Sequence, residues 1–285
     1  MATNTIKAGG QALADGVFMR TPLAWAIARQ DGSVEVGHMP LNRFAAVPAV
    51  RVLAGLGTAM KLGVGRGLLG KGSGAGSGRR GNRRFVAVLL AAEIAVLLLS
   101  PLVDVGGMSR LAAVSATVVP WFATLGLIRF AGPSAMWRYH GAEHKAVAAH
   151  EAGTDLDDLD AVLATTRIHN RCGTNLVLVM MVLGIVLLPL PTMAQIPVFL
   201  VGLAVTAELL SVAARRPHAL ASRILLSGGR ALQRYVTTSE PTRAEQQVGC
   251  LALQACLAEH AKVAALFAAE DTVALLAEAP VLVPA

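Results

Sequence analysis

Long runs of apolar residues dominate the middle of the chain and alternate with short polar connections. A helix needs roughly 20 apolar residues to cross a hydrocarbon core of about 30 Å. Four stretches approach this length: Phe85–Val103, Leu111–Ala131, Asn175–Thr192 and Ile196–Ala213. Short connections join the first to the second and the third to the fourth, so the pattern predicts a mainly α, polytopic membrane protein with about four transmembrane helices in two hairpins. The third stretch ends early at Pro189, where a re-entrant or tilted segment is the alternative.

The placement of basic residues predicts how these helices are oriented. Lys and Arg gather before the first stretch, between the two hairpins and after the fourth stretch, whereas the two short turns hold only Arg110. Cytoplasmic loops of membrane proteins carry an excess of Lys and Arg. We therefore expect a multi-pass protein of the cell inner (plasma) membrane with both termini in the cytoplasm.

Composition supports a membrane location and narrows the classes of partner. Of the 285 residues, 54% are hydrophobic and 15% are charged, against roughly 25% charged in an ordinary soluble domain. The net charge is +7, but the basic residues flank apolar stretches and do not alternate with aromatic ones. We therefore expect the lipid bilayer and its anionic headgroups as partners, and no nucleic acid; a homo-oligomer is left open. The three cysteines indicate a reducing compartment rather than a disulfide framework.

The two polar ends of the chain are predicted to fold outside the bilayer. Ala24–Val36 alternates moderately around Asp31-Gly32, which favours a β-hairpin with a type I′ turn. Ala45–Leu69 places basic residues at intervals in an apolar background, as in an amphipathic helix lying on a membrane. The expected organisation is an N-terminal β-rich segment (1–44), the interfacial helix with a Gly/Ser linker (45–84), a first transmembrane hairpin (85–131), a site loop (132–174), a second hairpin (175–213) and a soluble cytoplasmic helical tail (214–285).

The central loop carries the candidate chemistry. Pro133 and Gly153 bracket a predicted helix that contains His140, Glu143 and His144. Residues four apart lie on one helix face, so the two imidazoles can bind one metal ion. The H-x-x-E-H order also matches the inverted zincin motif, in which the carboxylate is the general base. The spacing therefore predicts a divalent metal, zinc above others, with Glu143 as the catalytic residue.

Further ligands are expected from the residues that follow. His169 and Cys172 form an H-x-x-C pair directly before the third apolar stretch, and a helix N-terminus there favours a thiolate. Four protein ligands make a closed, structural zinc site, whereas three leave an open catalytic position. Glu151 lies two turns beyond His144, about 10 Å along the helix, and Glu208 lies near the cytoplasmic end of the fourth stretch. Both are candidates for a supporting role around the metal.

Each of these residues also has a plainer interpretation. The two histidines can sit on an ordinary hydrogen-bonded helix, Cys172 can be an inert buried thiol, and Glu208 can bond to a neighbouring helix. Three functions are therefore weighed: a membrane-embedded zinc hydrolase, a membrane scaffold whose metal is structural, and an ion transporter that uses Glu93 and Glu208. The transporter ranks last because no inverted repeat is evident.

Five short motifs occur in the order found in a known family. They begin at Gly9 (GGQA, then DGVFMR), Tyr139 (YHGAEHK), His169 (HNRCGT), Ala207 (AE) and Thr237 (TTSEP). In this respect the chain resembles the YqhQ-like bacterial membrane proteins, a domain family of unknown function. The resemblance implies a multi-pass, predicted metal-dependent enzyme whose site contains His140, Glu143, His144, His169 and Cys172. Asp15 stands where the family has Glu; like Gln11, it is either a site residue contributed from afar or a turn former.

Overall fold

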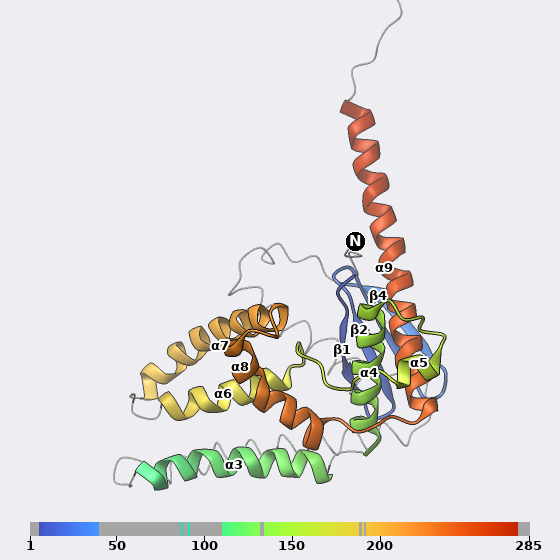
Figure 1. Ribbon diagram of the computed structural model, residues 1–285. Coiled ribbons are helices and arrows are strands. Elements are labelled where there is room, and N and C mark those ends of the chain that lie inside the picture. Colours follow the sequence, from blue (N-terminus) through green and yellow to red (C-terminus); the bar gives the residue numbers. More distant parts are fainter. Residues whose placement is uncertain are drawn as a thin grey trace, which may run out of the picture.

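A computed structural model describes residues 6–39, 87, 91, 110–131, 134–187, 190 and 192–278 of the chain. The described part is mainly helical, with one small antiparallel sheet near the N-terminus (Figure 1). It has two regions: an α/β unit around the sheet, and a set of apolar helices that projects to one side of it (Figure 1). Ala45–Leu69, the Gly/Ser linker and Phe85–Val103 with Glu93 lie outside the described residues, except for positions 87 and 91.

The sheet is a four-stranded meander rather than a single hairpin. Its strands are β1 (Gly9–Ala12), β2 (Gly16–Arg20), β3 (Ala24–Arg29) and β4 (Val34–His38), each antiparallel to the next. The turn between β3 and β4 contains Asp31 and Gly32, but it is not the predicted type I′ turn. That type needs a positive φ at both central residues, and among the described residues only Gly32 and Gly153 have one.

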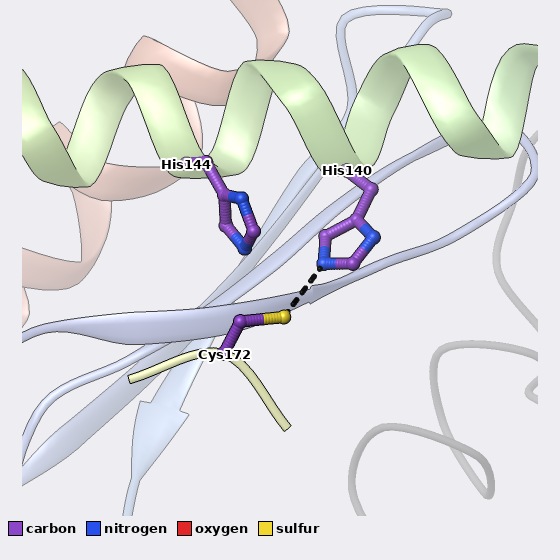
Figure 2. A group of neighbouring side chains, drawn as sticks. All are labelled: His140, His144 and Cys172. Carbon is purple, nitrogen blue, oxygen red and sulfur yellow. Dashed lines mark hydrogen bonds between the residues drawn. The ribbon is translucent and has the colours of Figure 1, made fainter. Parts of the chain in front are cut away.

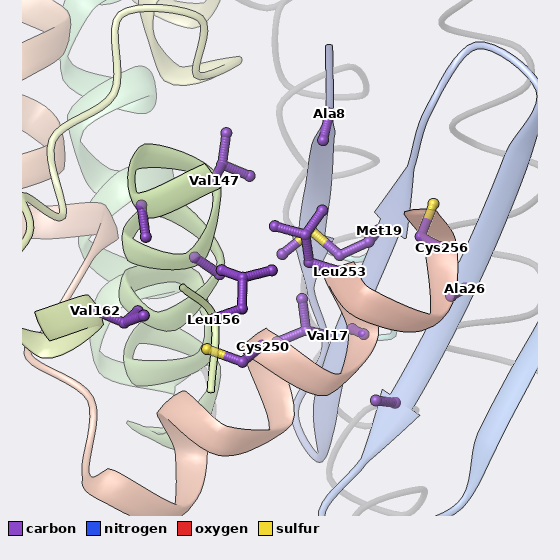
Figure 3. Packing of buried hydrophobic residues seen from close by; sticks show 14 of the residues in the cluster. Ala8, Val17, Met19, Ala26, Val147, Leu156, Val162, Cys250, Leu253 and Cys256 are labelled. Atoms are coloured by element: carbon purple, nitrogen blue, oxygen red, sulfur yellow. The ribbon is translucent and has the colours of Figure 1, made fainter. Parts of the chain in front are cut away.

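Two helices cover one face of the sheet and form the core of the α/β unit. These are α4 (Ser134–Ala152) and α9 (Arg243–Glu278), with the short α5 (Leu159–Leu163) beside them. Leu253 and Cys256 of α9 are completely buried in the same cluster as Met19 and Ala26 of the sheet (Figure 3). Alanine and glycine let these layers approach closely: a Cβ on Gly249 of α9 would lie 3.1 Å from the Ala142 carbonyl oxygen of α4.

The apolar helices are α3 (Arg110–Ala131), α6 (Thr174–Leu187), α7 (Thr192–Arg215) and α8 (Leu220–Leu232). In α6, Leu178 and Leu183 fill the space above Gly228 of α8 and Gly202 of α7, where a Cβ would be only 2.1 and 2.3 Å from the leucine methyl carbons. Helix packing through glycines of this kind is common in membranes. Large apolar side chains of this region remain exposed, among them Val201, Val205 and Leu209 of α7.

The prediction of four transmembrane helices in two hairpins is wrong. Among the described residues, two helical segments are long and apolar enough to span a membrane, Pro197–Arg215 and Arg243–Ala268. The predicted third span contains a 14-residue helix, α6, which is shorter than the roughly 20 residues that a membrane crossing needs. The second predicted span is helical, but its apolar part, Val118–Leu127, is too short. Helix α9, which falls in the predicted soluble helical tail, packs on the N-terminal sheet.

Candidate metal centre

The histidines of the central loop lie on a regular helix, α4. It begins at Ser134 and ends at Ala152, which confirms the helix predicted between Pro133 and Gly153. Gly153 stops the helix with a φ of +74°, a conformation that glycine adopts without steric cost. The Gly153 N–H donates to the His150 carbonyl oxygen at 3.1 Å, closing the last turn. His140 and His144 therefore point from consecutive turns of one face toward the loop that precedes α6 (Figure 2).

Three side chains converge here from two segments. The ligand atoms of His140, His144 and Cys172 lie within 4.8 Å of one another. Cys172 Sγ is 3.5 Å from His140 Nε2, and the two imidazole centroids are 4.4 Å apart (Figure 2). Tetrahedral zinc, with Zn–S and Zn–N bonds of about 2.3 and 2.0–2.1 Å, separates sulfur from nitrogen by about 3.6 Å. The spacing between Cys172 and His140 thus matches one edge of such a site.

Backbone carbonyls determine which nitrogen of each histidine is available. His140 Nδ1 lies 2.6 Å from the Thr237 carbonyl oxygen, and His144 Nδ1 lies 2.6 Å from the Arg167 carbonyl oxygen. A carbonyl can only accept a hydrogen bond, so both rings carry a proton on Nδ1. The Nε2 lone pairs are left free to coordinate a metal when the rings are neutral. This outer hydrogen bond is typical of histidines that bind metals.

A strap formed by residues 237–241 runs along α4 and supplies one of these carbonyls. It begins at the end of η4 (Gln233–Thr237), a turn of π-helix that follows α8. The Ser239 N–H donates to the Trp137 carbonyl oxygen at 2.9 Å, and a Cβ on Gly141 would lie 2.1 Å from the Ser239 carbonyl oxygen. Only glycine at position 141 therefore lets the strap lie flat on the helix and bring Thr237 to His140.

Cys172 is held by the start of α6. The helix begins at Thr174, whose Oγ1 is 2.9 Å from Cys172 Sγ, and the Asn175 N–H donates to the Cys172 carbonyl oxygen at 3.1 Å. The free N–H groups of a helix N-terminus favour negative charge nearby. The buried Gln233 side chain accepts from the His169 N–H at 2.7 Å and donates to the His169 carbonyl at 3.0 Å. The loop that carries the cysteine is thus tied to the π-helix.

His169, the fourth predicted ligand, lies beside the three-residue group but outside it. Its ring centroid is 5.8 Å from that of His144, and its Nε2 is 3.3 Å from a carboxylate oxygen of Glu151. Glu151 also forms a close ion pair with Arg171. Burial raises the pKa of Glu151, but the hydrogen bond to His169 and the charge of Arg171 more than offset it, so the pKa lies below its ordinary value. The structure therefore brings Glu151 to His169 rather than to the other three ligands.

Glu143 lies next to the group and faces the edge of the sheet. Its side chain is buried, with Oε2 3.9 Å from His140 Nε2. A Cβ on Gly10 of β1 would lie 3.1 Å from Glu143 Cγ, so glycine leaves room for the carboxylate. Burial lowers the pKa of the Arg20 guanidinium below its ordinary value, and the negative charge of Glu143 partly offsets this shift. The two groups therefore lie within electrostatic range of each other. Burial raises the pKa of neighbouring Tyr139 to about 12, so its hydroxyl stays protonated near neutral pH.

The remaining predicted site residues are placed elsewhere. Asp15 forms an ion pair of 2.9 Å with Arg29 and fastens the β1–β2 turn to the end of β3. Gln11 follows Gly10 in β1, and because successive strand residues point to opposite faces, it points away from Glu143. Glu208 is half-buried in α7. None of these three joins the group of His140, His144 and Cys172.

Several residues that organise the site were not singled out from the sequence. The buried Lys145 donates to the Leu163 and Thr165 carbonyl oxygens at 2.7 and 2.8 Å and pairs with Glu240 at 3.1 Å. Arg167 pairs with Glu240 at 2.9 Å while its own carbonyl holds His144. Burial raises the pKa of Glu240, but hydrogen bonds from Lys145 and Arg167 more than offset this and leave it lowered. Lys145 lies in the YHGAEHK motif and Glu240 lies in the TTSEP motif. These motifs were the sequence signal that could have identified both residues.

The donor set could hold a divalent metal. Two neutral imidazoles and one thiolate would match the N and S ligands that zinc prefers. The other two cysteines are unavailable, since Cys250 and Cys256 are buried in the core between α9 and the sheet. Three protein ligands, rather than the four of a closed site, are therefore in position.

Comparison with known proteins places the chain in a family. A family model described as "Protein of unknown function (DUF1385)" matches residues 88–259. The matched region includes all three converging ligands, Glu143 and the strap. No curated protein and no solved structure was found to match the chain. Since the match covers more than half of its length, the chain belongs to the DUF1385 family of proteins of unknown function.

Proposed function

We propose that the protein is a zinc-dependent, hydrolase-like enzyme of the YqhQ-like type. One observation carries the proposal: two imidazoles whose Nδ1 protons are bound by backbone carbonyls aim their free Nε2 atoms at a cysteine sulfur, with a buried carboxylate beside them. A structural zinc would take a fourth protein ligand, and the nearest further histidine, His169, is engaged by Glu151. The arrangement therefore favours a catalytic metal over a scaffold.

Each residue has a distinct task in this scheme. His140, His144 and Cys172 would hold the metal, which would supply Lewis-acid activation of water and of the substrate carbonyl or phosphoryl group. Glu143, whose Oε2 lies 3.9 Å from His140 Nε2, would be the proton acceptor beside the metal. The Thr237 and Arg167 carbonyls keep both imidazoles in the Nδ1-protonated form. His169, which is hydrogen-bonded to Glu151, is a polar residue at the border of the site.

We also propose that the protein resides in the inner membrane with its α/β unit in the cytoplasm. The exposed valine and leucine side chains of α7 support a lipid contact. The C-terminal end of α7, whose last turn is basic, lies toward the α/β unit (Figure 1), which agrees with the excess of basic residues in cytoplasmic segments. The N-terminal sheet and α9 pack together and are therefore expected on the same side of the membrane.

Metal content of the purified full-length protein tests the site. We expect about one zinc per chain in the wild type, and loss of the metal in the double variant His140→Ala/His144→Ala and in Cys172→Ser. His150→Ala is the matched control, because His150 lies on the same helix but bonds to the Ile6 carbonyl oxygen at 3.0 Å. Unchanged zinc in the double variant would rule out the site.

The role of the metal is tested by its ligands and by Glu143→Gln. X-ray absorption is expected to show two nitrogens, one sulfur and one oxygen around zinc; four protein ligands without oxygen would assign a structural metal. Glu143→Gln is expected to retain zinc but to lower hydrolysis of p-nitrophenyl acetate or p-nitrophenyl phosphate by about 10²–10⁴-fold, the usual contribution of a general base. Loss of zinc in this variant would instead make Glu143 a structural residue.

A further inference from the structure

Helix α8 carries an apolar stripe that nothing in the described structure covers. Leu220, Ile224, Ala231 and Tyr235 recur at intervals of four and seven, which places them on one face of α8 and its continuation in η4. Leu220, Ile224 and Tyr235 are 71%, 67% and 73% exposed. The opposite face, with Ser222, Leu226 and Gly229, is buried against α6 and α7. This helix is therefore packed on one side and apolar on the other.

The charge around the stripe has a single sign. Between Arg215 and Thr237 the chain has five arginines and no acidic residue. Arg216, Arg223 and Arg234 are exposed, whereas Arg230 donates to the Asn170 side chain at 2.9 Å. Basic residues flanking an exposed apolar stripe, with a tyrosine near one end, are typical of helices that lie in the plane of an anionic membrane surface.

The position of α8 in the fold fits such a surface. The helix follows directly after the basic end of α7 (Figure 1). The C-terminal end of α3 carries Arg129 and Phe130, the latter 89% exposed, and α3 contacts η4. The positive and apolar groups of three helices thus occur together at the end of the apolar helices that faces the α/β unit.

We propose that the stripe of Leu220, Ile224 and Tyr235 lies on a bilayer surface, where Arg216, Arg223 and Arg234 contact anionic lipid headgroups. A second copy of the chain is a poorer occupant, since it would bring the same unbalanced positive charges to the interface. The inference goes beyond the metal chemistry and rests on the proposed membrane location. Because the same segment ends at Thr237, whose carbonyl holds His140, contact with the surface keeps the candidate metal centre beside the headgroups.

Lipid quenching of fluorescence tests the contact in the full-length protein. Tyr235→Trp is reconstituted in nanodiscs of brominated phosphatidylcholine with or without phosphatidylglycerol, and the wild type in the same discs gives the signal of the native tryptophans. We expect stronger quenching of the introduced indole when phosphatidylglycerol is present. Adding Arg223→Glu and Arg234→Glu is expected to weaken docking by at least about fivefold per arginine, corresponding to the loss of about 1 kcal/mol for each basic residue near an anionic surface.

Two controls make the result decisive. Lys262→Glu, an exposed charge reversal on α9, is expected to leave the quenching unchanged, whereas Leu220→Gln/Ile224→Gln is expected to reduce it without changing the net charge. Equal quenching with and without phosphatidylglycerol, or no effect of the arginine reversals, overturns the proposal. So does a change of oligomeric size in detergent caused by those reversals, which would assign the face to a second copy. Zinc content, measured on each variant, separates any of these results from a failure of the metal site.

Discussion

Helices α7 and α9 differ in length, with 24 and 36 residues, and they also differ in how their apolar side chains are covered. Both contain a segment that is long and apolar enough to cross a membrane. In α9 the apolar face is closed off by the sheet and α4, with Leu253 and Cys256 fully buried. In α7, Val201 and Leu209 are exposed. The hydropathy of a helix indicates how favourable it is for its apolar side chains to leave water. Whether those side chains then contact protein or lipid depends on the rest of the chain.

The largest expected effect is a difference in stability between leucine substitutions in α9 and in α7. Leu253→Ala should lower the free energy of unfolding by about 2–5 kcal/mol, because it leaves a cavity in a closed core. Leu209→Ala on the exposed face of α7 should change it by less than about 0.5 kcal/mol. Denaturant unfolding of the detergent-solubilised protein measures both. Equal costs would mean that α7 is as fully packed as α9.

A second pair of substitutions compares glycines on helices of the two regions. Gly141→Ala places a methyl group 2.1 Å from the Ser239 carbonyl oxygen, and the forced displacement should cost about 1–3 kcal/mol. The strap then moves away from His140, so zinc content should also fall. Gly184→Ala in α6 meets no atom within 4 Å and should leave zinc content unchanged. Wild-type zinc in Gly141→Ala would show that the strap is not needed for metal binding.

A smaller effect on stability is expected from substitutions at the start of α9, within the α/β unit. Thr242 and Glu245 form a capping box: the Thr242 N–H donates to Glu245 Oε2 at 2.9 Å, and the Glu245 N–H donates to Thr242 Oγ1 at 3.3 Å. Thr242→Ala should lower stability by about 1 kcal/mol. Thr242→Ser keeps the hydroxyl and should restore most of it. The same loss in both variants would show that the cap contributes nothing.

The smallest effect is predicted for Glu240 and depends on pH. Its pKa in the folded chain is lowered, so its pairs with Lys145 and Arg167 stabilise the protein above the ordinary carboxyl pKa and are lost as the pH falls through the lowered value. Glu240→Gln should therefore cost about 0.2–1 kcal/mol at neutral pH, as for other exposed pairs, and nothing in strong acid. Melting curves of the metal-free protein at both pH values measure this difference. A cost that persists in acid would contradict an electrostatic role.

Local patterns in the sequence were sufficient for the parts of the site that lie close together along the chain. Helix α4 followed from its bracketing residues, and the helical period placed His140 and His144 on one face. The converging cysteine was identified from its spacing to His169 and its place before α6. His169 lies beside this group, with its Nε2 3.3 Å from Glu151, and no residue type in the sequence indicates that pairing.

Long-range packing accounts for what the sequence could not predict. The carbonyls of Thr237 and Arg167 orient the two histidines, but every residue has a carbonyl, so no residue type signals this role. The pairing of α9 with the sheet was missed because its alanine-rich surface and the alanines of β3 lack the strong alternation that marks a half-buried element. The same uniform apolar character made α6, a 14-residue helix, look like part of a membrane span.

The hydrogen bond from His140 to Thr237 joins residues that are made at different times during synthesis. The two residues are 97 positions apart, so at a translation rate of about 5–20 residues per second the second one leaves the ribosome roughly 5–20 s after the first. Cys172 follows His140 by only 32 positions, so all three candidate ligands are present before the carbonyl that orients His140. A chain that stops before η4 therefore carries His140, His144 and Cys172 without the carbonyl that orients His140.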